Sequence, residues 1–408
     1  MYTLLKNKTD RVANEVVRFT RELVRTPSVS LGEKKIAEII ERKMKELEYD
    51  RVFRDEWGNV IGVVYGQNLS PAVILNSHMD TVDIKNNKKW HQDPFGAHII
   101  DNKLYGLGAS DCKSGLAAQV YAGAILKHSL LPLKGTLVMA ATVAEKNGRS
   151  IGLRALVEHS LPSLEIAPSF AILGETTNLD LYYGHDGWVE MNILVEGEQP
   201  FHVEDVANGI YKDLEETRSQ QCQGHAESFR VLPPSYEDTM GRRRANIQFS
   251  RKINQEQSYK DLMFHVKKNA SMIAENFGSV AVKVDVKQEN QKLYTGKTVV
   301  AKSIVNAWST EPYHPLIERS RQVLAAAGCA VTPKKWQLNR LEMGTAGSAL
   351  VNKFNIPTVG YGPGQLDMAH AVNECVEVPN IPRAVYGTAA VVHGLIGYPV
   401  FGWTSDEI

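Results

Sequence analysis

The chain has 408 residues, a length typical of two or three domains. It carries 46 basic and 46 acidic residues, and this zero net charge gives no electrostatic basis for binding nucleic acid or an anionic membrane. The hydrophobic share of 43% and the charged share of 23% are those of a soluble globular protein. We expect no transmembrane segment, because no run approaches the roughly 18 apolar residues that span a bilayer. We also expect no secretory signal, because the first residues lack an apolar core.

The first part of the chain alternates helical and strand patterns. Amphipathic or alanine-rich segments predict helices, and short β-branched runs between turn residues predict strands. We expect helices over 8–26 and 31–48, and Ser30 is the predicted cap of the second. In chain order there follow predicted strands over 60–66 and 71–78, a helix over 114–129, a strand over 135–144, a helix over 151–159 and a strand over 169–175. This alternation is typical of an α/β domain with a largely buried sheet.

The pattern changes after Gly174 and later returns. We expect strands over 188–197, 245–253 and 280–288, of which the first and the last alternate apolar and polar residues. Between them lie a polar stretch over 213–245 and a predicted helix over 258–277. The α/β pattern then resumes with helices over 314–327, 346–354 and 380–396 and a strand over 356–362. We therefore predict an α/β domain (1–182 and 298–408) that carries an inserted α+β domain (183–297).

Four cysteines lie far apart, at Cys112, Cys222, Cys329 and Cys375, and none forms a CxxC pair. This spacing argues against a zinc knuckle and a redox pair. A disulfide framework is not expected in a chain of this size, so the sequence predicts a cytoplasmic protein.

His78 and Asp80 follow a buried apolar strand, where α/β folds place their ligands. Two residues apart on a strand, they point the same way. An imidazole beside a carboxylate suits a zinc ligand and the group that orients it. A purely structural His–Asp pair is the alternative.

Asp111 lies in the glycine-containing segment LYGLGASDCKSG, just before a predicted helix. A carboxylate here could bridge two metal ions. A phosphate-binding loop is excluded, because the spacing is not G-x-x-x-x-G-K-[ST] and an Asp within the loop would repel phosphate. A simple helix cap stays open as the alternative.

Glu145, Glu175 and His370 each follow a predicted strand as well. Taken singly, each is better read as a polar residue at the start of a loop. Taken with His78 and Asp111, they match the oxygen and nitrogen ligands of a zinc-like ion, with one carboxylate left over as a base.

Five segments carry a resemblance to a known family: NSHMDTVD, WHQDPFGAHIIDNKLYGLGASDCKSG, TVAEKNG, GETTNLDLYYGHDG and IPTVGYGPGQLDMAH. In this order, over nearly the whole chain, they resemble the zinc metallopeptidase superfamily of acetylornithine deacetylases, succinyl-diaminopimelate desuccinylases, aminoacylases and glutamate-releasing carboxypeptidases. The resemblance implies a zinc-peptidase-like catalytic domain, an inserted lid that often dimerises, and hence a homodimer.

The resemblance also implies roles for single residues. His78, Asp111 and Glu175 would hold one metal ion, Asp111 would bridge to a second ion, and His370 would belong to that second ion. Glu145 matches the general base, and Asp80 would orient His78.

The chain departs from the family where two consecutive glutamates are usual, because it reads Glu145-Lys146. An ammonium cannot ligate a metal and would repel one. Lys146 would then stand in the second metal position as a fixed cation, or point to solvent and leave that site weakened.

The predicted lid departs too. The family usually has a lid histidine that stabilises the oxyanion of the partner's site; here His202 is the candidate, with a plain surface histidine as the alternative. Asp186 and Ser250 replace residues that are usual in the family. Arg244 is the nearest candidate for binding a substrate carboxylate, against a solvated basic run.

The sequence thus predicts a metal-dependent hydrolase that cleaves the amide bond of an N-acyl amino acid or small peptide. We expect zinc as the cofactor, as one or two ions, and cobalt and manganese share these ligands. The alternative, suggested by Lys146 and the altered lid, is a non-hydrolytic or metal-depleted relative. Such a protein would act as a binding or regulatory subunit, or catalyse a different reaction in the same cleft.

Overall fold

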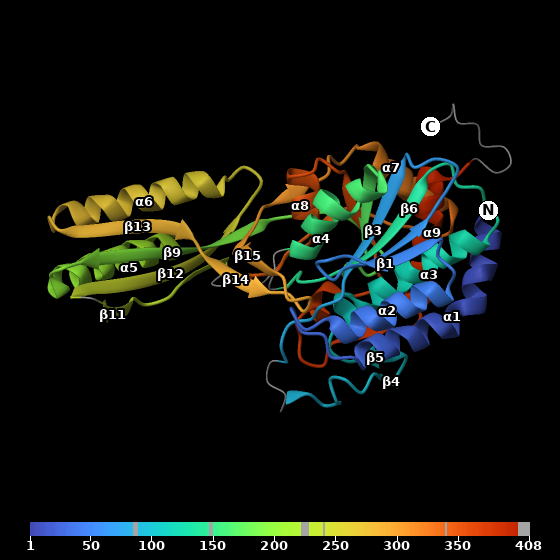
Figure 1. Cartoon of the computed structure of the whole chain (residues 1–408), viewed down its shortest axis with the longest axis horizontal. Helices are drawn as coiled ribbons and strands as arrows, with labels where there is room; N and C mark the ends of the chain where they lie inside the picture. The colour runs from blue at the N-terminus through green and yellow to red at the C-terminus, as the bar shows by residue number, and fades with distance from the viewer. Residues whose placement is uncertain (85–88, 147–149, 222–227, 240, 339–340, 399–408) are drawn as a thin grey trace.

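The computed structural model describes residues 1–84, 89–146, 150–221, 228–239, 241–338 and 341–398. The molecule is elongated, with a large α/β body that carries the N-terminus and a smaller body at the opposite end (Figure 1). Cys222 lies outside the described residues, and the cysteines at 112, 329 and 375 are free thiols.

A nine-stranded mixed sheet forms the centre of the large body. Its order is β1 (Arg51–Arg54), β2 (Val60–Val64), β6 (Thr136–Thr142), β3 (Ala72–His78), β7 (Pro168–Leu173), β19 (Thr358–Gly360), β8 (Leu181–His185) and β17 (Trp308–Ser309), with β18 (Pro333–Trp336) paired to β8. Strands β6, β3, β7 and β19 run parallel, whereas β1 and β2 pair antiparallel at one edge. The predicted α/β class is confirmed.

Helices cover both faces of this sheet, which explains why β3 and β6 are buried at every residue. One face packs on α1 (Tyr2–Val24), α2 (Lys34–Glu46), α3 (Ser114–His128), α7 (Pro315–Ala326) and α9 (Asn380–Ile396). The other packs on α4 (Ile151–Ala155), the turn η3 (Leu156–Ser160) and α8 (Gly347–Asn352). Along β3, Val73 and Leu75 face the first layer and Ala72 and Ile74 the second, as strand alternation requires.

The small body has its own sheet and its own core. The sheet contains β10 (Phe229–Val231), β12 (Arg242–Ile253), β9 (Gly187–Gly197) and β13 (Val280–Val286), with β11 (Ser235–Thr239) on β12 and β16 (Ile304–Val305) on β9. Helices α5 (Pro200–Gln221) and α6 (Tyr259–Glu275) pack on it. The ribbon β14 (Gln288–Lys292) and β15 (Thr298–Lys302) runs between the two bodies (Figure 1).

One helix was not predicted, and one local prediction is wrong. The polar stretch from 213 begins inside α5, where Val203, Val206, Ile210 and Leu214 form a helical stripe that is buried against the sheet, although charged and amide residues outnumber it. Ser30 is not a helix cap, because its hydroxyl donates to Asp80 and α2 begins at Lys34.

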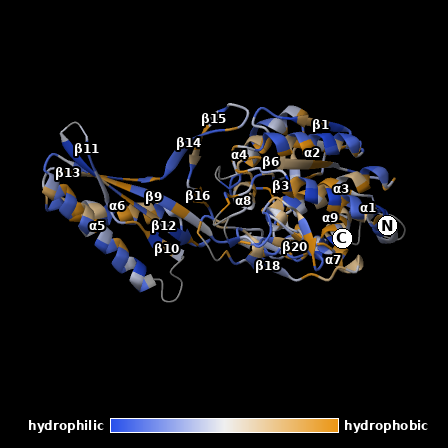
Figure 2. Ribbon diagram, turned by 90° about the horizontal axis from the view of Figure 1, so that it is seen from below, coloured by the Kyte–Doolittle hydropathy of each residue, from blue (hydrophilic) through white to orange (hydrophobic). Residues whose placement is uncertain are grey.

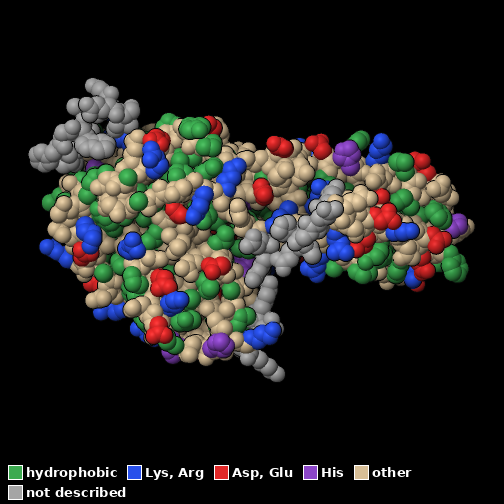
Figure 3. Space-filling model, turned by 180° about the vertical axis from the view of Figure 1, so that it is seen from behind, with side chains coloured by type: hydrophobic (Ala, Val, Ile, Leu, Met, Phe, Trp, Pro, Cys, Tyr) green, Lys and Arg blue, Asp and Glu red, His purple; other side chains and the backbone are tan. Residues whose placement is uncertain are grey.

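Hydrophobic side chains and charged side chains are distributed as expected for a globular protein without net charge. Hydrophobic residues concentrate on the packed strands and helices of both bodies (Figure 2). Acidic and basic side chains are interspersed on the face seen in Figure 3, as the zero net charge suggests. Within the described ranges, no helix combines the length and the apolar character needed to cross a bilayer.

A small three-stranded sheet lies beside the turn that precedes α3. It consists of β20 (Cys375–Glu377), β5 (Lys103–Tyr105) and β4 (His98–Ile100). It matters for the site because Glu374, directly before β20, accepts three backbone hydrogen bonds from the segment that contains Asp111.

His185, at the end of β8, has a neutral ring that bridges the backbone at Asp186 and Thr345. The tautomer that carries its proton on Nδ1 donates to the Asp186 carbonyl at 2.7 Å and accepts at Nε2 from the Thr345 N–H at 2.9 Å. Protonation of Nε2 would place a second N–H against the Thr345 N–H, and this disfavours the charged ring. Burial lowers the pKa of His185 from its ordinary 6.5 to about 4.

We therefore expect the free energy of unfolding to decrease as the pH falls from 6.5 toward 4, because the unfolded state takes up this proton first. The effect of His185 over this window is about 3 kcal/mol. Urea unfolding of the wild type and of His185→Gln, which cannot titrate, measures it across this pH range. A stability difference between the two that does not change with pH would contradict the prediction.

Candidate metal and catalytic site

The parallel strands bring the predicted residues to one edge of the sheet. His78 ends β3, Glu145 follows β6 and Glu175 follows β7, and these three strands are neighbours. Asp111 lies in the turn η2 (Ala109–Lys113) that leads into α3, and His370 follows the turn η6 (Leu366–Met368) after β19. Because carboxyl ends of parallel strands share an edge, side chains distant in sequence meet there.

Four of these side chains are within direct reach of one another. Asp111 is central: its Oδ1 lies 3.1 Å from His78 Nε2, and its Oδ2 lies 3.0 Å from His370 Nε2. Glu175 Oε2 is 4.0 Å from His78 Nε2. All four are largely buried, so the cluster is a pre-formed group of nitrogen and oxygen donors.

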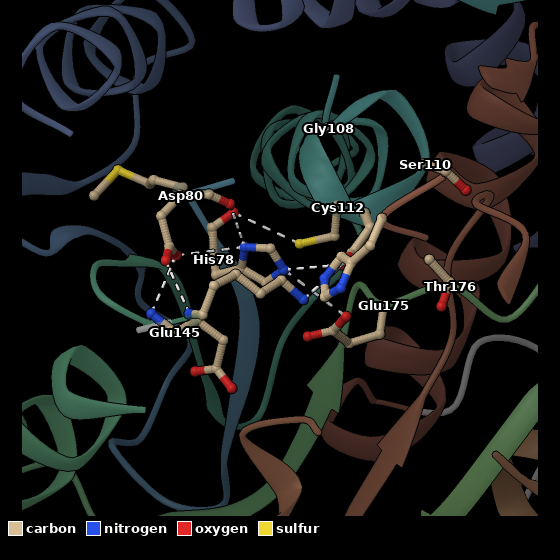
Figure 4. Close-up of polar contacts among 12 residues, drawn as sticks. His78, Asp80, Gly108, Ser110, Cys112, Glu145, Glu175 and Thr176 are labelled. Carbon is tan, nitrogen blue, oxygen red and sulfur yellow. Dashed lines mark hydrogen bonds and ion pairs between the residues drawn. The ribbon is translucent and has the colours of Figure 1, made fainter. Parts of the chain in front are cut away.

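Asp80 holds the neighbouring loop in place. Its two carboxylate oxygens accept from the backbone N–H of Glu145 at 3.1 Å and of Lys146 at 2.9 Å, and also from the Ser30 hydroxyl. His78 Nδ1 lies 3.5 Å from Asp80 Oδ1 and 2.8 Å from the Asp80 carbonyl oxygen. Asp80 therefore ties the orientation of His78 to the position of Glu145 (Figure 4).

Glu145 is a buried carboxylate with one free oxygen. The Ser150 hydroxyl donates to Oε1 at 2.9 Å, whereas Oε2 accepts no hydrogen bond from the residues that the structure describes. Burial raises the pKa of Glu145 to about 7. A carboxylate with a pKa near neutrality and an open oxygen is suited to general-base work.

Lys146 points into the site and not to solvent. Its Nζ lies 2.9 Å from Asp111 Oδ2 and 3.0 Å from Oδ1, and only 9% of its side chain is exposed. Burial lowers the pKa of Lys146, but Asp111 and Glu175 raise it more, so the ammonium stays charged. Burial raises the pKa of Asp111, but Lys146 and the two imidazoles bring it well below its usual range.

Two features shape the segment around Asp111, and sequence reasoning missed the first of them, Glu374. Glu374 accepts from the N–H groups of Gly108, Ser110 and Asp111, each at 2.8 Å, and so fixes the backbone that presents Asp111. Gly108 has a φ of 82°, which favours glycine. The sequence signal was present but weak: Glu374 lies just after His370, in the same loop.

A second missed residue is Cys112. One donor atom each from His78, Cys112 and Glu175 lie within 4.8 Å of one another, and all three residues are buried. Figure 4 shows Cys112 and Glu175 on one side of the His78 ring, with Asp80 on the other. Nitrogen, sulfur and oxygen donors in a buried group, with an unpaired Glu145 oxygen, fit a divalent ion such as zinc.

Two predicted residues are not brought to this cluster within one chain. His202 lies in the first turn of α5 with its ring 5.6 Å from that of Phe277. Arg244, on β12, donates to Glu196 at 2.6 Å. The roles expected for these two in substrate binding stay predictions.

The cluster has the donors and the base that metal-dependent hydrolysis of an amide bond requires. Residues 74–393 match the family described as Peptidase family M20/M25/M40, and the chain belongs to this family.

Similar proteins agree with this placement. The chain is 26% identical to the uncharacterized protein YgeY of Escherichia coli K12, over 91% of this chain and 92% of YgeY. It is 32% identical to succinyl-diaminopimelate desuccinylase 2 of Ruegeria sp. TM1040, over 46% and 49% of the two chains. The fold is similar to that of Bacillus subtilis YXEP, a dinuclear metal-binding peptidase of family M20, with a TM-score of 0.68, 13% identity and coverage of 95% and 99%.

Proposed function

We propose that this chain hydrolyses the amide bond of N-acyl amino acids or small peptides with a single zinc ion. The observation that carries the proposal is the buried cluster of His78, Asp111 and Glu175 beside the open oxygen of Glu145. His78 and Glu175 would hold the ion, with Asp111 next to it. When bound, such an ion polarises the scissile carbonyl and lowers the pKa of water to about 7.

The chain's own residues would move the proton. Glu145 Oε2 takes a proton from the attacking water and passes it to the leaving amine, while Ser150 holds Oε1 in place. Asp80 fixes the backbone of Glu145, so the base keeps its position through both transfers. The low exposure of the cluster excludes bulk water and strengthens each electrostatic interaction.

Lys146 supports a one-ion site. Its ammonium already lies against both oxygens of Asp111, where a bridging carboxylate would meet a second ion. A second divalent ion at that point would experience direct repulsion from the ammonium. His370 then interacts with Asp111 rather than with a metal, at 3.0 Å.

Substrate class, assembly and domain boundaries are parts of the same proposal. The similar desuccinylase acts, by its name, on succinyl-diaminopimelate, and this supports an N-acyl amino acid as the substrate class for the chain. We place the lid at residues 183–297 and the catalytic parts at 1–182 and 298–408, which is supported by the separate core of the small body. We also propose a cytoplasmic homodimer; the three free cysteines support the compartment.

Metal analysis and a substrate panel test this proposal. Freshly purified protein should contain about one zinc per chain. It should hydrolyse members of a panel of N-acetyl and N-succinyl amino acids and dipeptides, lose this activity with a chelator and regain it with zinc. A metal-free protein that hydrolyses none of the panel, with or without added zinc, would overturn the proposal in favour of a non-hydrolytic relative.

A further inference from the structure

We propose that Cys112 supplies a sulfur ligand to the bound ion, so that His78, Cys112 and Glu175 form the primary ligand set. This inference rests on the proposed metal-dependent function and goes further, because it changes the chemical character of the site. The donor atoms of these three residues lie within 4.8 Å of one another. Ligand atoms around a tetrahedral zinc are about 3.3–4 Å apart, so the ion needs to draw the most distant pair together by at most about 1.5 Å.

The local backbone presents Cys112 to the site. Neighbouring residues of a regular helix do not face the same point. In η2, however, Asp111 (φ −121°, ψ 91°) and Cys112 (φ −133°, ψ 34°) both depart from helical values. As a result, Asp111 contacts His78 Nε2 while Cys112 Sγ lies 3.6 Å from the His78 carbonyl oxygen.

Charge balance favours the thiolate. The ammonium of Lys146 lies against both oxygens of Asp111 and neutralises the charge of that carboxylate. Of the expected ligands His78, Asp111 and Glu175, only Glu175 then offers an uncompensated negative charge to the ion. A thiolate from Cys112 brings the ligand charge to that of a divalent ion. As the metal–sulfur bond forms, the thiol proton leaves to solvent.

The existing contacts of Asp111 also favour Cys112 over Asp111 as the ligand. Its oxygens already interact with Lys146, His78 and His370 at 2.9–3.1 Å. Direct ligation by Asp111 would have to displace these partners, whereas Cys112, among the residues that the structure describes, gives up one weak hydrogen bond, to the His78 carbonyl oxygen. A sulfur ligand also predicts that the site prefers zinc over manganese, since soft thiolates select zinc.

Cobalt substitution tests the assignment by spectroscopy rather than activity. Chelator-treated protein given one equivalent of Co²⁺ should show visible d–d bands and an intense near-ultraviolet band of thiolate-to-cobalt charge transfer. In Cys112→Ser the charge-transfer band should vanish while the d–d bands remain, and zinc affinity should fall about 10-fold or more. Cys329→Ser, which changes a free cysteine near α7, should retain the full spectrum.

The outcomes separate the two proposals. Cobalt d–d bands without a charge-transfer band in the wild type would overturn the role of Cys112 and leave the hydrolase intact. Failure to bind cobalt or zinc at all would overturn both. If Cys112→Ser does not fold, X-ray absorption at the zinc edge of the wild type decides: one sulfur at about 2.3 Å supports the proposal, and only nitrogen and oxygen neighbours refute it.

Discussion

Replacing Glu145 by Gln should reduce kcat about 10²–10⁴-fold while leaving the metal bound. The amide retains the size of the side chain and can still accept from Ser150, but it cannot take a proton from water. Because Glu145 is not among the proposed ligands, zinc content should stay at about one per chain. Steady-state kinetics and metal analysis on the same preparation measure both quantities.

The pH profile gives an independent check on this residue. Burial raises the pKa of Glu145 to about 7, and only the ionised form can act as a base. Wild-type kcat/KM should therefore decrease as the pH falls below neutrality, with a midpoint at or below pH 7 because a bound cation favours the carboxylate.

A matched control for this variant is Glu38→Gln, an exposed glutamate on α2. It should keep wild-type kcat and the same pH profile. If Glu145→Gln turns over substrate as fast as Glu38→Gln does, Glu145 is not the base.

Replacing Lys146 by Glu should raise the metal content from about one to about two ions per chain. The change removes the ammonium that lies 2.9 Å from Asp111 and places a carboxylate within reach of Asp111 and His370. Oxygen and nitrogen donors with a bridging carboxylate then form a second site. Metal analysis after dialysis against dilute zinc measures the change.

Lys146→Met separates the two effects of that substitution, because it removes the charge without adding a ligand. It should stay at about one ion per chain, although loss of the ammonium leaves Asp111 less well compensated. A Lys146→Glu protein that still holds a single ion would show that Lys146 is not what limits the site.

The architecture was accessible from the sequence because it depends on local patterns. Apolar runs such as 71–78 and 135–144 are buried on both faces in the structure, and the return of the α/β pattern after residue 298 indicated an insertion. Helix α5 was missed because its apolar stripe is narrow and lies among Glu and Gln residues. Its helical state is fixed by packing on the small sheet, which a local pattern does not reveal.

The site was accessible only in part, for a similar reason. His78, Asp111, Glu145, Glu175 and His370 were recognisable because each follows a strand or opens a helix, and strand ends meet. The direction of the Lys146 side chain depends on a contact with Asp111, far away in sequence, so both directions stayed open. Cys112 carries no spacing signal and Glu374 only a weak one, from its place just after His370, so the folded loop is needed to show what they contact.

Diffraction from crystals of the zinc-loaded protein, recorded at the zinc absorption edge, shows directly how many ions the site holds and where they lie. We predict one anomalous peak per chain, within ligand distance of His78 and Glu175, with the Lys146 ammonium against the far side of Asp111. Two peaks on either side of Asp111, with Lys146 turned outward, would contradict the one-ion site. A peak remote from His78 and Glu175 would contradict the site itself.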